Sequence, residues 1–406
     1  MRRIDIDRFV RATRSTSRDI NRRIILNLVR ENEPVSRADL ARRMGIGRGM
    51  VTSLVSELIE AGEIYSGSTV AAPRGRRPEM LFVRTRDRYV VAIDVRLTRT
   101  YLMLSDFGGR PTAMDSFETI VEPGDLASEL GRRISSLLEK HDARGICEGI
   151  GLVVPGMVDK QTGAVLRAPQ LGWSNVNIQG AVSEATGLPV YIENAPIACA
   201  LARMWIDRGE DRAPQNFVYV TVSDGVGAAI VSRGEVMRGA SDAAGEFGHV
   251  PIAEDGPQCM CGSSGCLEAH TSNLATIVRY LGEDFSPATA RETVTSSGLT
   301  IEDIIERRAH GDDRADLSLH ETARFLALGI AGIVNAVDPG VIFVGGEVTG
   351  VWDIFGPAIA KAIESRALTP HARATAVIPE APGSHPRLHG ATALVAARSF
   401  AAPVIG

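Results

Sequence analysis

Lysine, cysteine and aromatic residues are scarce in this sequence of 406 residues. Only three of the 44 basic residues are lysines, and aromatic residues make up 5% of the chain. The five cysteines are an odd number, and Cys147 and Cys199 stand alone in apolar surroundings, which favours reduced thiols over a disulfide framework. No apolar run approaches the roughly 18 residues of a membrane helix, and the charged N-terminus lacks the apolar core of a signal peptide. We therefore expect a cytoplasmic protein with no membrane partner.

Charge is divided unevenly along a chain that is long enough for two or three domains. Residues 1–88 contain 19 arginines, no lysine and 11 acidic residues, so this segment carries +8 and the remainder carries −13. A basic segment on an acidic body suggests a polyanionic partner for the first part alone. The low lysine content explains part of the arginine excess, but the difference in sign does not depend on it.

Residues 20–66 have the pattern of three short helices followed by a β-wing. The segment 36–45 begins with a serine N-cap and ends with a glycine. A tight turn leads to the segment 48–62, whose apolar residues follow the i, i+3, i+4, i+7, i+8 pattern of one buried helix face. The first helix is expected to bury four residues: Ile24, Ile25, Leu28 and Val29. Helices and wing in this order, on a basic segment, favour DNA binding over a plain helical core.

The residues expected to contact DNA lie at the starts of the second and third helices and in the wing. Small polar residues and an arginine at the start of a second motif helix are what a helix-turn-helix places in the major groove. Arginines in the wing are placed to reach phosphates or a narrow minor groove. The candidate contacts are Ser36, Arg37, Arg48, Thr52, Ser53, Arg74, Arg76 and Arg77. A double-stranded DNA operator is the partner that this arrangement predicts.

From residue 89 the sequence pattern changes to alternating strands and helices. Three strands followed by helix and strand in alternation occupy residues 89–205, and the same order begins again at residue 216. Two such units imply two α/β lobes that face one another across a cleft.

Four motifs in this body carry a family resemblance. The segments GLVVPGMVD, VSDGVGAAIVSRGEVMRGASDAAGEFGH, CMCGSSGCLE and VIFVGGEV resemble the ROK family, and the similarity covers nearly all of residues 89–400. That family groups sugar-responsive repressors with sugar kinases, and members with a winged helix-turn-helix domain resemble the xylose and N-acetylglucosamine repressors. The resemblance implies an α/β fold, in which a two-lobed actin-like (ribonuclease-H-like) body follows an N-terminal all-α, winged helix-turn-helix domain.

We expect three domains on this basis. The winged helix-turn-helix domain should comprise residues 1–85, and the first lobe residues 86–195, with the helix 388–401 returning to it. The second lobe should comprise residues 196–387 and contain the cysteine-rich loop.

The segment CMCGSSGCLE holds three cysteines within eight positions. His249 precedes Cys259 by ten residues, and Cys261 and Cys266 follow at spacings of two and five. Three thiolates and one imidazole make a closed tetrahedral site that zinc prefers, and such a site stabilises a loop with little core of its own. The alternative is three reduced thiols beneath a loop. The family resemblance implies these same four ligands and a structural Zn²⁺.

The resemblance also implies a sugar site beside the cysteines. In the family, the zinc-bound histidine and two glutamates hydrogen-bond sugar hydroxyls, and carboxylates suit this role because each accepts two hydrogen bonds from a vicinal diol. The corresponding sugar contacts, with the asparagine and turn that complete the family's pocket, are Pro155, Gly156, Asn194, Glu246, His249 and Glu268. The alternative for Glu246 and Glu268 is that they are solvated loop acids.

Two requirements of the family's kinases are broken in this chain. The kinases carry Glu-Asn-Asp-Ala-Asn, in which the aspartate is the general base, and Ala195 stands in its place. Their phosphate-binding turn, Asp-x-Gly-Gly-Thr-Lys, has Arg96 and Leu97 here in place of the two glycines, which allow backbone amides to approach phosphates. We therefore expect no enzyme activity and assign no catalytic residue.

The leading hypothesis is a sugar-responsive transcriptional regulator that represses genes of carbohydrate uptake and catabolism. It would act as a homodimer or homotetramer on a pseudo-palindromic operator. Two alternatives stay open at this point. One is an ATP-dependent sugar kinase with a DNA-binding appendage, and the other is a regulator whose effector is a partner protein that docks on the cysteine-rich loop.

Overall fold

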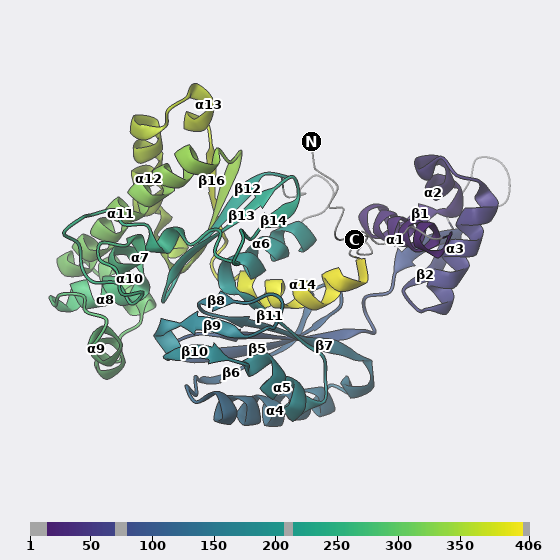
Figure 1. Ribbon diagram of the computed structural model, residues 1–406, viewed down its shortest axis with the longest axis horizontal. Helices are drawn as coiled ribbons and strands as arrows, with labels where there is room; N and C mark the ends of the chain where they lie inside the picture. The colour runs from purple at the N-terminus through teal and green to yellow at the C-terminus, as the bar shows by residue number, and fades with distance from the viewer. Residues whose placement is uncertain (1–13, 70–78, 207–213, 401–406) are drawn as a thin grey trace.

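The computed structural model describes residues 14–69, 79–206 and 214–400. A small helical domain lies beside a body of two α/β lobes, each of which is built on a five-stranded sheet (Figure 1). This confirms the predicted class, an α/β body behind an N-terminal helical domain.

The N-terminal domain forms the predicted helices and wing strands. Ser36 caps the second helix as expected, because its hydroxyl oxygen accepts a hydrogen bond from Asp39 N at 3.2 Å and its hydroxyl donates to the Asp39 carboxylate at 2.6 Å. The strands pair antiparallel in the order β1-β3-β2. The wing residues Arg74, Arg76 and Arg77 lie outside the described residues. The elements are α1 (Arg14–Asn32), β1 (Val35–Ser36), α2 (Arg37–Met44), α3 (Arg48–Glu60), β2 (Ile64–Thr69) and β3 (Glu79–Val83).

Helix α1 buries most of the face that the sequence indicates, together with one neighbouring residue. It buries Ile25, Leu26 and Val29. In contrast, Ile24 remains 41% exposed and Leu28 is only partly buried. Helix α1 contacts α3 of its own domain and also α14, the C-terminal helix of the body.

The first lobe is a mixed sheet in the order β11-β7-β4-β5-β6 with helices on both faces. Helices α4 and α5 pack on one face, and α6 and α14 cover the other (Figure 1). A second, three-stranded sheet, β10-β9-β8, adjoins β11. The elements are β4 (Tyr89–Val95), β5 (Arg99–Asp106), β6 (Pro111–Glu118), α4 (Pro123–Lys140), β7 (Cys147–Val154), β8 (Met157–Val158), β9 (Val165–Ala168), β10 (Trp173–Val176), α5 (Ile178–Thr186), β11 (Val190–Asn194), α6 (Ala195–Ile206) and α14 (Pro386–Phe400).

The second lobe repeats the sheet in the order β14-β13-β12-β15-β16. Its helices enclose the largest hydrophobic cluster of the described residues, with α11 at the centre. The elements are β12 (Phe217–Val222), β13 (Val226–Ser232), β14 (Glu235–Met237), α7 (Leu267–Thr271), α8 (Asn273–Leu281), α9 (Ala290–Ser297), α10 (Ile301–Ala309), α11 (Asp313–Val337), β15 (Val341–Gly346), α12 (Trp352–Arg366), α13 (Pro370–Arg373) and β16 (Ala376–Pro379).

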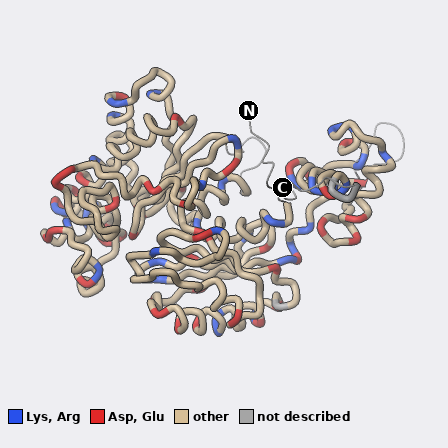
Figure 2. The backbone as a smooth tube through the Cα atoms, viewed as in Figure 1, with Lys and Arg blue, Asp and Glu red and all other residues tan. Residues whose placement is uncertain are grey.

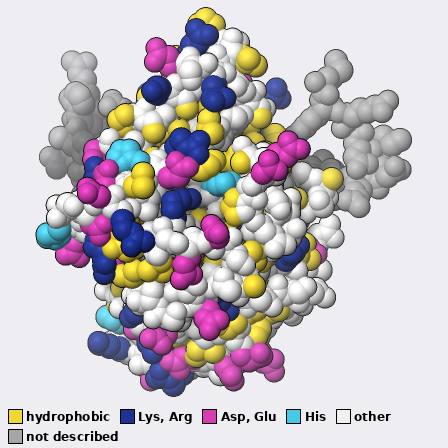
Figure 3. All heavy atoms as spheres, turned by 90° about the vertical axis from the view of Figure 1, so that its left-hand side faces the viewer, with side chains coloured by type: hydrophobic (Ala, Val, Ile, Leu, Met, Phe, Trp, Pro, Cys, Tyr) yellow, Lys and Arg dark blue, Asp and Glu magenta, His cyan; other side chains and the backbone are white. Residues whose placement is uncertain are grey.

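Helix α11 is the one helix in the described ranges whose length and composition would suit a membrane span. Its most apolar 18-residue window has a mean hydropathy of 1.3, and 56% of that window is buried. The buried residues belong to the second-lobe core, and Figure 3 shows charged side chains of both signs on the outer face of this lobe. The apolar character of α11 is therefore explained by its place in the core.

Two helices, α6 and α14, cross closely and end on the N-terminal domain. At Gly390 a Cβ atom would lie 2.1 Å from the carbonyl oxygen of Ala198, so only glycine allows this approach. At the far ends, the rings of Trp205 and Phe400 meet edge to face with centroids 4.8 Å apart. The guanidinium of Arg30 in α1 lies 3.3 Å from the centroid of Trp205 and donates a hydrogen bond to its carbonyl oxygen. The N-terminal domain is thus docked on the ends of both helices.

Replacing Gly390 with alanine is expected to lower the free energy of unfolding by about 1–3 kcal/mol, because the added methyl group would force two backbones apart. The measurement is chemical or thermal denaturation of the full chain. The matched control is Gly332→Ala in α11, an exposed position where an added methyl group would have no atom within 4 Å. This control should gain up to about 1 kcal/mol from helix propensity. Equal stability of the two variants would contradict the close crossing.

Candidate functional site

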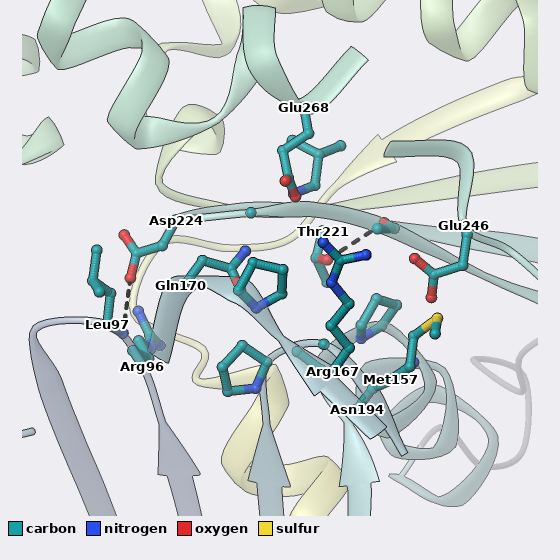
Figure 4. A pocket seen from close by; sticks show the side chains of 18 of the residues that line it. Arg96, Leu97, Met157, Arg167, Gln170, Asn194, Thr221, Asp224, Glu246 and Glu268 are labelled. Atoms are coloured by element: carbon teal, nitrogen blue, oxygen red, sulfur yellow. Dashed lines mark hydrogen bonds between the residues drawn. The ribbon is translucent and has the colours of Figure 1, made fainter. Parts of the chain in front are cut away.

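A cavity between the two lobes is the main candidate site. Its volume is about 960 Å³ including its opening to solvent, which suits a small-molecule ligand. Figure 4 shows side chains from both lobes pointing into it. All six predicted sugar contacts line this cavity: Pro155, Gly156, Asn194, Glu246, His249 and Glu268. The structure therefore brings these residues together from separate segments of the chain.

Two carboxyl groups face the cavity from the second lobe. Glu268 lies in the first turn of α7, and its Oε2 accepts a hydrogen bond from Val226 N at 2.9 Å. Gly225 leaves room for this carboxyl group, since a Cβ there would lie 2.8 Å from the same oxygen. Burial raises the pKa of Glu268 to about 7, and burial also raises the pKa of Glu246. Both groups offer hydrogen bonds to a polar ligand.

Asn194 joins the cavity to helix α6. Its Oδ1 accepts a hydrogen bond at 3.1 Å from the backbone N–H of Ile197, the third residue of the helix, so the side chain caps α6 while it lines the cavity. The adjacent Glu193 is buried and pairs with Arg238 of the second lobe. Pro196 packs against Gly227, where a Cβ would lie 2.6 Å from the proline ring. Close packing against Pro196 therefore explains why a glycine stands at position 227 in the cavity wall.

Three lining residues that sequence analysis missed come from the small sheet. Met157 and Arg167 are paired across β8 and β9, and Gln170 follows β9 in a buried position. Figure 4 shows the Arg167 side chain rising from β9 into the cavity. These strands have only two to four residues, which is too short for a periodic pattern to be visible in the sequence.

The four predicted metal ligands form one cluster. The ligand atoms of His249, Cys259, Cys261 and Cys266 all lie within 4.8 Å of one another. The Sγ atoms of Cys261 and Cys266 are 3.7 Å apart, and Cys259 Sγ is 3.7 Å from His249 Nδ1. Tetrahedral zinc, with Zn–S bonds of about 2.3 Å, places neighbouring sulfur atoms about 3.8 Å apart. The sulfur spacing therefore fits a metal site and is far too long for a disulfide bond of about 2.05 Å.

Beside the cavity, side chains of both lobes join at the turn after β4. Arg96 donates hydrogen bonds to Asp94 at 2.7 Å and to Glu347 of the second lobe at 3.0 Å. The backbone N–H of Leu97 donates to Asp224 at 3.2 Å, as the dashed line in Figure 4 shows. Burial, together with the nearby Glu347 charge, raises the pKa of Asp224. The residues that replace the two glycines of the kinase motif thus connect the lobes directly.

The exposed side of α3 is the candidate DNA-contacting surface. Arg48, Thr52 and Ser53 are exposed there, while the apolar face of the helix is buried as the sequence predicts. Met50, which sequence analysis did not single out, is 52% exposed on the same turn. At the start of α2, Ser36 is buried and caps the helix, so its side chain is less accessible to DNA than those of α3. The surface that α3 offers to a partner is therefore polar with one apolar side chain.

Charges on this domain are largely paired within it. Arg37 at the start of α2 forms an ion pair with Glu79 at 2.9 Å, and Figure 2 shows positions of acidic and basic residues interspersed along the helices of this domain. Among the described residues of this domain, Arg43 and Arg48 are exposed and form no ion pair. They are the charges that remain available for phosphate contacts.

Comparison with known proteins identifies the family. The ROK family pattern matches residues 90–398, and a winged helix-turn-helix DNA-binding pattern matches residues 18–64. The chain is 28% identical over 357 residues to the xylose repressor of Caldicellulosiruptor bescii, covering 86% of this chain and 88% of that protein. It is also 30% identical over 291 residues to a glucokinase of Halalkalibacterium halodurans, covering 70% of this chain and 87% of that enzyme.

A solved structure extends the likeness to the whole chain. The crystal structure of a ROK family transcriptional regulator, a homologue of the E. coli MLC protein, superposes with a TM-score of 0.77 at 26% identity, covering 95% of this chain and 97% of that chain. These findings confirm the resemblance and the actin-like body that the sequence motifs indicate. The protein belongs to the ROK family and joins an N-terminal winged helix-turn-helix domain to the family's two-lobed body.

Proposed function

We propose that this protein is a sugar-responsive repressor that binds a double-stranded DNA operator in the cytoplasm and controls genes of carbohydrate uptake and catabolism. One observation carries the proposal: α6 and α14 connect the cavity to the DNA-binding domain. Asn194 and Pro196 line the cavity at one end of α6, and Trp205 contacts Arg30 of the DNA-binding domain at the other. Arg387 of α14 also lines the cavity. The similarity to a xylose repressor supports the same function.

In this proposal, a sugar acts by favouring one closure angle of the lobes. A change of that angle would displace the two DNA-binding domains of a homodimer or homotetramer. Operator half-sites lie about 34–36 Å apart, so a modest displacement prevents both domains from binding together. The sugar must bind one closure state more tightly than the other, because equal affinity would shift no equilibrium.

We further propose that the protein has no kinase activity, although it resembles a glucokinase over its body. Ala195 lines the cavity where family kinases carry the general base, and a methyl group cannot accept a proton. The pairing of Arg96 with Asp94 and Glu347 uses the turn that would otherwise hold phosphates. Both features support the view that this chain has the sugar site of the family's kinases but lacks their phosphoryl-transfer site.

The metal cluster is proposed to hold a structural Zn²⁺ through its three cysteines and His249. Zinc would bind the Nδ1 atom of His249, which faces Cys259, and would leave Nε2 on the cavity side, 3.7 Å from Glu246 Oε2. Bound metal supplies a rigid crosslink and fixes the orientation of the ring. His249 and Glu246 would then meet a sugar as a fixed pair of hydrogen-bonding groups.

Replacing Cys261 with serine is expected to reduce bound zinc from about one ion per chain to near zero and to lower the melting temperature, because the loop loses its crosslink. Elemental analysis and thermal denaturation provide the measurements. The matched control is Cys147→Ser, which lies outside the cluster and should retain its zinc. Wild-type protein that holds no zinc after reconstitution would contradict the assignment.

The sugar response itself is tested by replacing Glu246 with alanine. This change should leave operator affinity unchanged and weaken the sugar effect at least about tenfold, since a lost hydrogen bond to a charged group is worth about 1.5–3 kcal/mol. The measurement is fluorescence anisotropy on labelled DNA from upstream of the protein's own and neighbouring genes, with a sugar panel at fixed salt. Glu254→Ala, an exposed acid on the metal loop, is the control. Loss of DNA binding in a folded Glu246→Ala protein would count against the proposal.

Replacing Arg30 with glutamine is expected to separate sugar binding from DNA release. The variant should bind sugar with unchanged affinity, yet release DNA only at higher sugar concentration or not at all, because the contact with Trp205 carries the signal. Calorimetry and anisotropy measure the two steps. The control is Arg324→Gln, whose guanidinium also covers a ring, Phe325 at 3.9 Å, but in the second lobe. An unchanged DNA response in Arg30→Gln would show that the signal travels elsewhere.

A further inference from the structure

Three arginines line the cavity, and one of them is unpaired. Arg96 is neutralised by its two carboxylate partners, and Arg387 lies 3.7 Å from Asp94 Oδ1. Arg167 has no ion pair and no side-chain hydrogen bond within the described part of the chain, and it is exposed to the open space of the cavity. It is therefore a positive charge that no carboxylate of the described residues contacts directly.

The position of Arg167 is fixed by the backbone beneath it. A Cβ on Gly156 would lie 2.0 Å from the carbonyl oxygen of Arg167, so β9 lies directly against the turn that carries Pro155 and Gly156. In Figure 4 the side chain rises from this strand toward Thr221 of the second lobe. The guanidinium thus projects from a rigid element beside two of the predicted sugar contacts and faces the opposite wall of the cavity.

Three acidic side chains also line the cavity. Glu246 lies 3.7 Å from His249 Nε2, and among the described residues it forms no ion pair with Arg167. The other two have partners elsewhere in the protein. Glu268 accepts a hydrogen bond from the backbone of Val226 at 2.9 Å, and Asp224 accepts one from Leu97 at 3.2 Å. Arg167 is consequently left to interact with a ligand. A guanidinium is always charged, and its planar donors match a phosphate or carboxylate in a bidentate manner.

We propose that the ligand of this cavity is a monosaccharide that carries an anionic group, a phosphate ester or a carboxylate, and that Arg167 binds this group. The proposal deepens the proposed function, since it rests on the cavity being the effector site. The glutamates, Asn194 and His249 would bind hydroxyl groups, and Arg167 would select for charge. A neutral parent sugar would bind less tightly because Arg167 would contribute at most hydrogen bonds to hydroxyls.

The test is calorimetry of the full, zinc-reconstituted chain with matched series of glucose, galactose and N-acetylglucosamine, each compared with its 6-phosphate and with the corresponding uronic acid. In at least one series an anionic member should bind about tenfold or more tightly than its neutral parent. Arg167→Gln should remove this difference while leaving the affinity for the neutral parent nearly unchanged. Arg110→Gln, an exposed arginine outside the cavity, should change neither affinity. The phosphate and uronate arms identify the source of the charge.

Three results would overturn the proposal. One is that no anionic member in any series binds better than its neutral parent. Another is that Arg167→Gln weakens neutral and anionic sugars alike, and the last is that inorganic phosphate competes as well as a sugar phosphate. DNA anisotropy with the same panel tests the repressor function and the anionic ligand separately. If only a neutral sugar releases DNA, the repressor function stands and the anionic ligand is rejected. A failure of every sugar to affect DNA binding would instead reject the proposed function.

Discussion

The close crossing of α6 and α14 at Gly390 is the constraint on which the rest of this structure depends. At 1.5 Å per residue, helices of 12 and 15 residues are about 18 and 22 Å long, enough to reach from the cavity to the DNA-binding domain. Backbone contact at the crossing leaves no soft side chain between the helices to absorb a displacement. The same pair is tied to the second lobe, because Arg203 of α6 binds Glu380 through two hydrogen bonds of 2.9 and 2.8 Å. The DNA-binding domain is therefore attached to an element held by both lobes.

The cleft carries a second set of ties, on the side where a kinase would hold its nucleotide. Here the Arg96–Glu347 ion pair and the hydrogen bond from Leu97 to Asp224 already join the lobes on that side. Each of these contacts places a carboxylate from the second lobe against the turn after β4. Because Arg96, Leu97 and Asp224 also line the ligand cavity, these contacts between the lobes belong to the wall of the same site.

Some of the features that the sequence predicted are encoded by local spacing. The capping box at Ser36 and the buried stripe of α3 depend on residues a few positions apart, so their geometry follows from the backbone. The metal ligands and the sugar contacts come from more distant segments, and they were predicted through the family motifs. The missed features depend on contacts between distant segments. The contact of α1 with α14 joins segments more than 300 residues apart, and Arg167 was missed because its strand is too short to show a period. Neither signal is present in a single local window.

Ligand choice and signal transmission lie on different elements of the first lobe. Arg167 belongs to the small sheet of β8, β9 and β10, which joins the lobe by contact with β11. In the proposed function, the signal to DNA passes along α6 and α14, and Asn194 both caps α6 and lines the cavity. A substitution in the small sheet can therefore change which sugar is bound without altering the helix crossing. Because a ligand acts only through its different affinity for the two closure states, the same helices can report any sugar that draws the lobes to one angle.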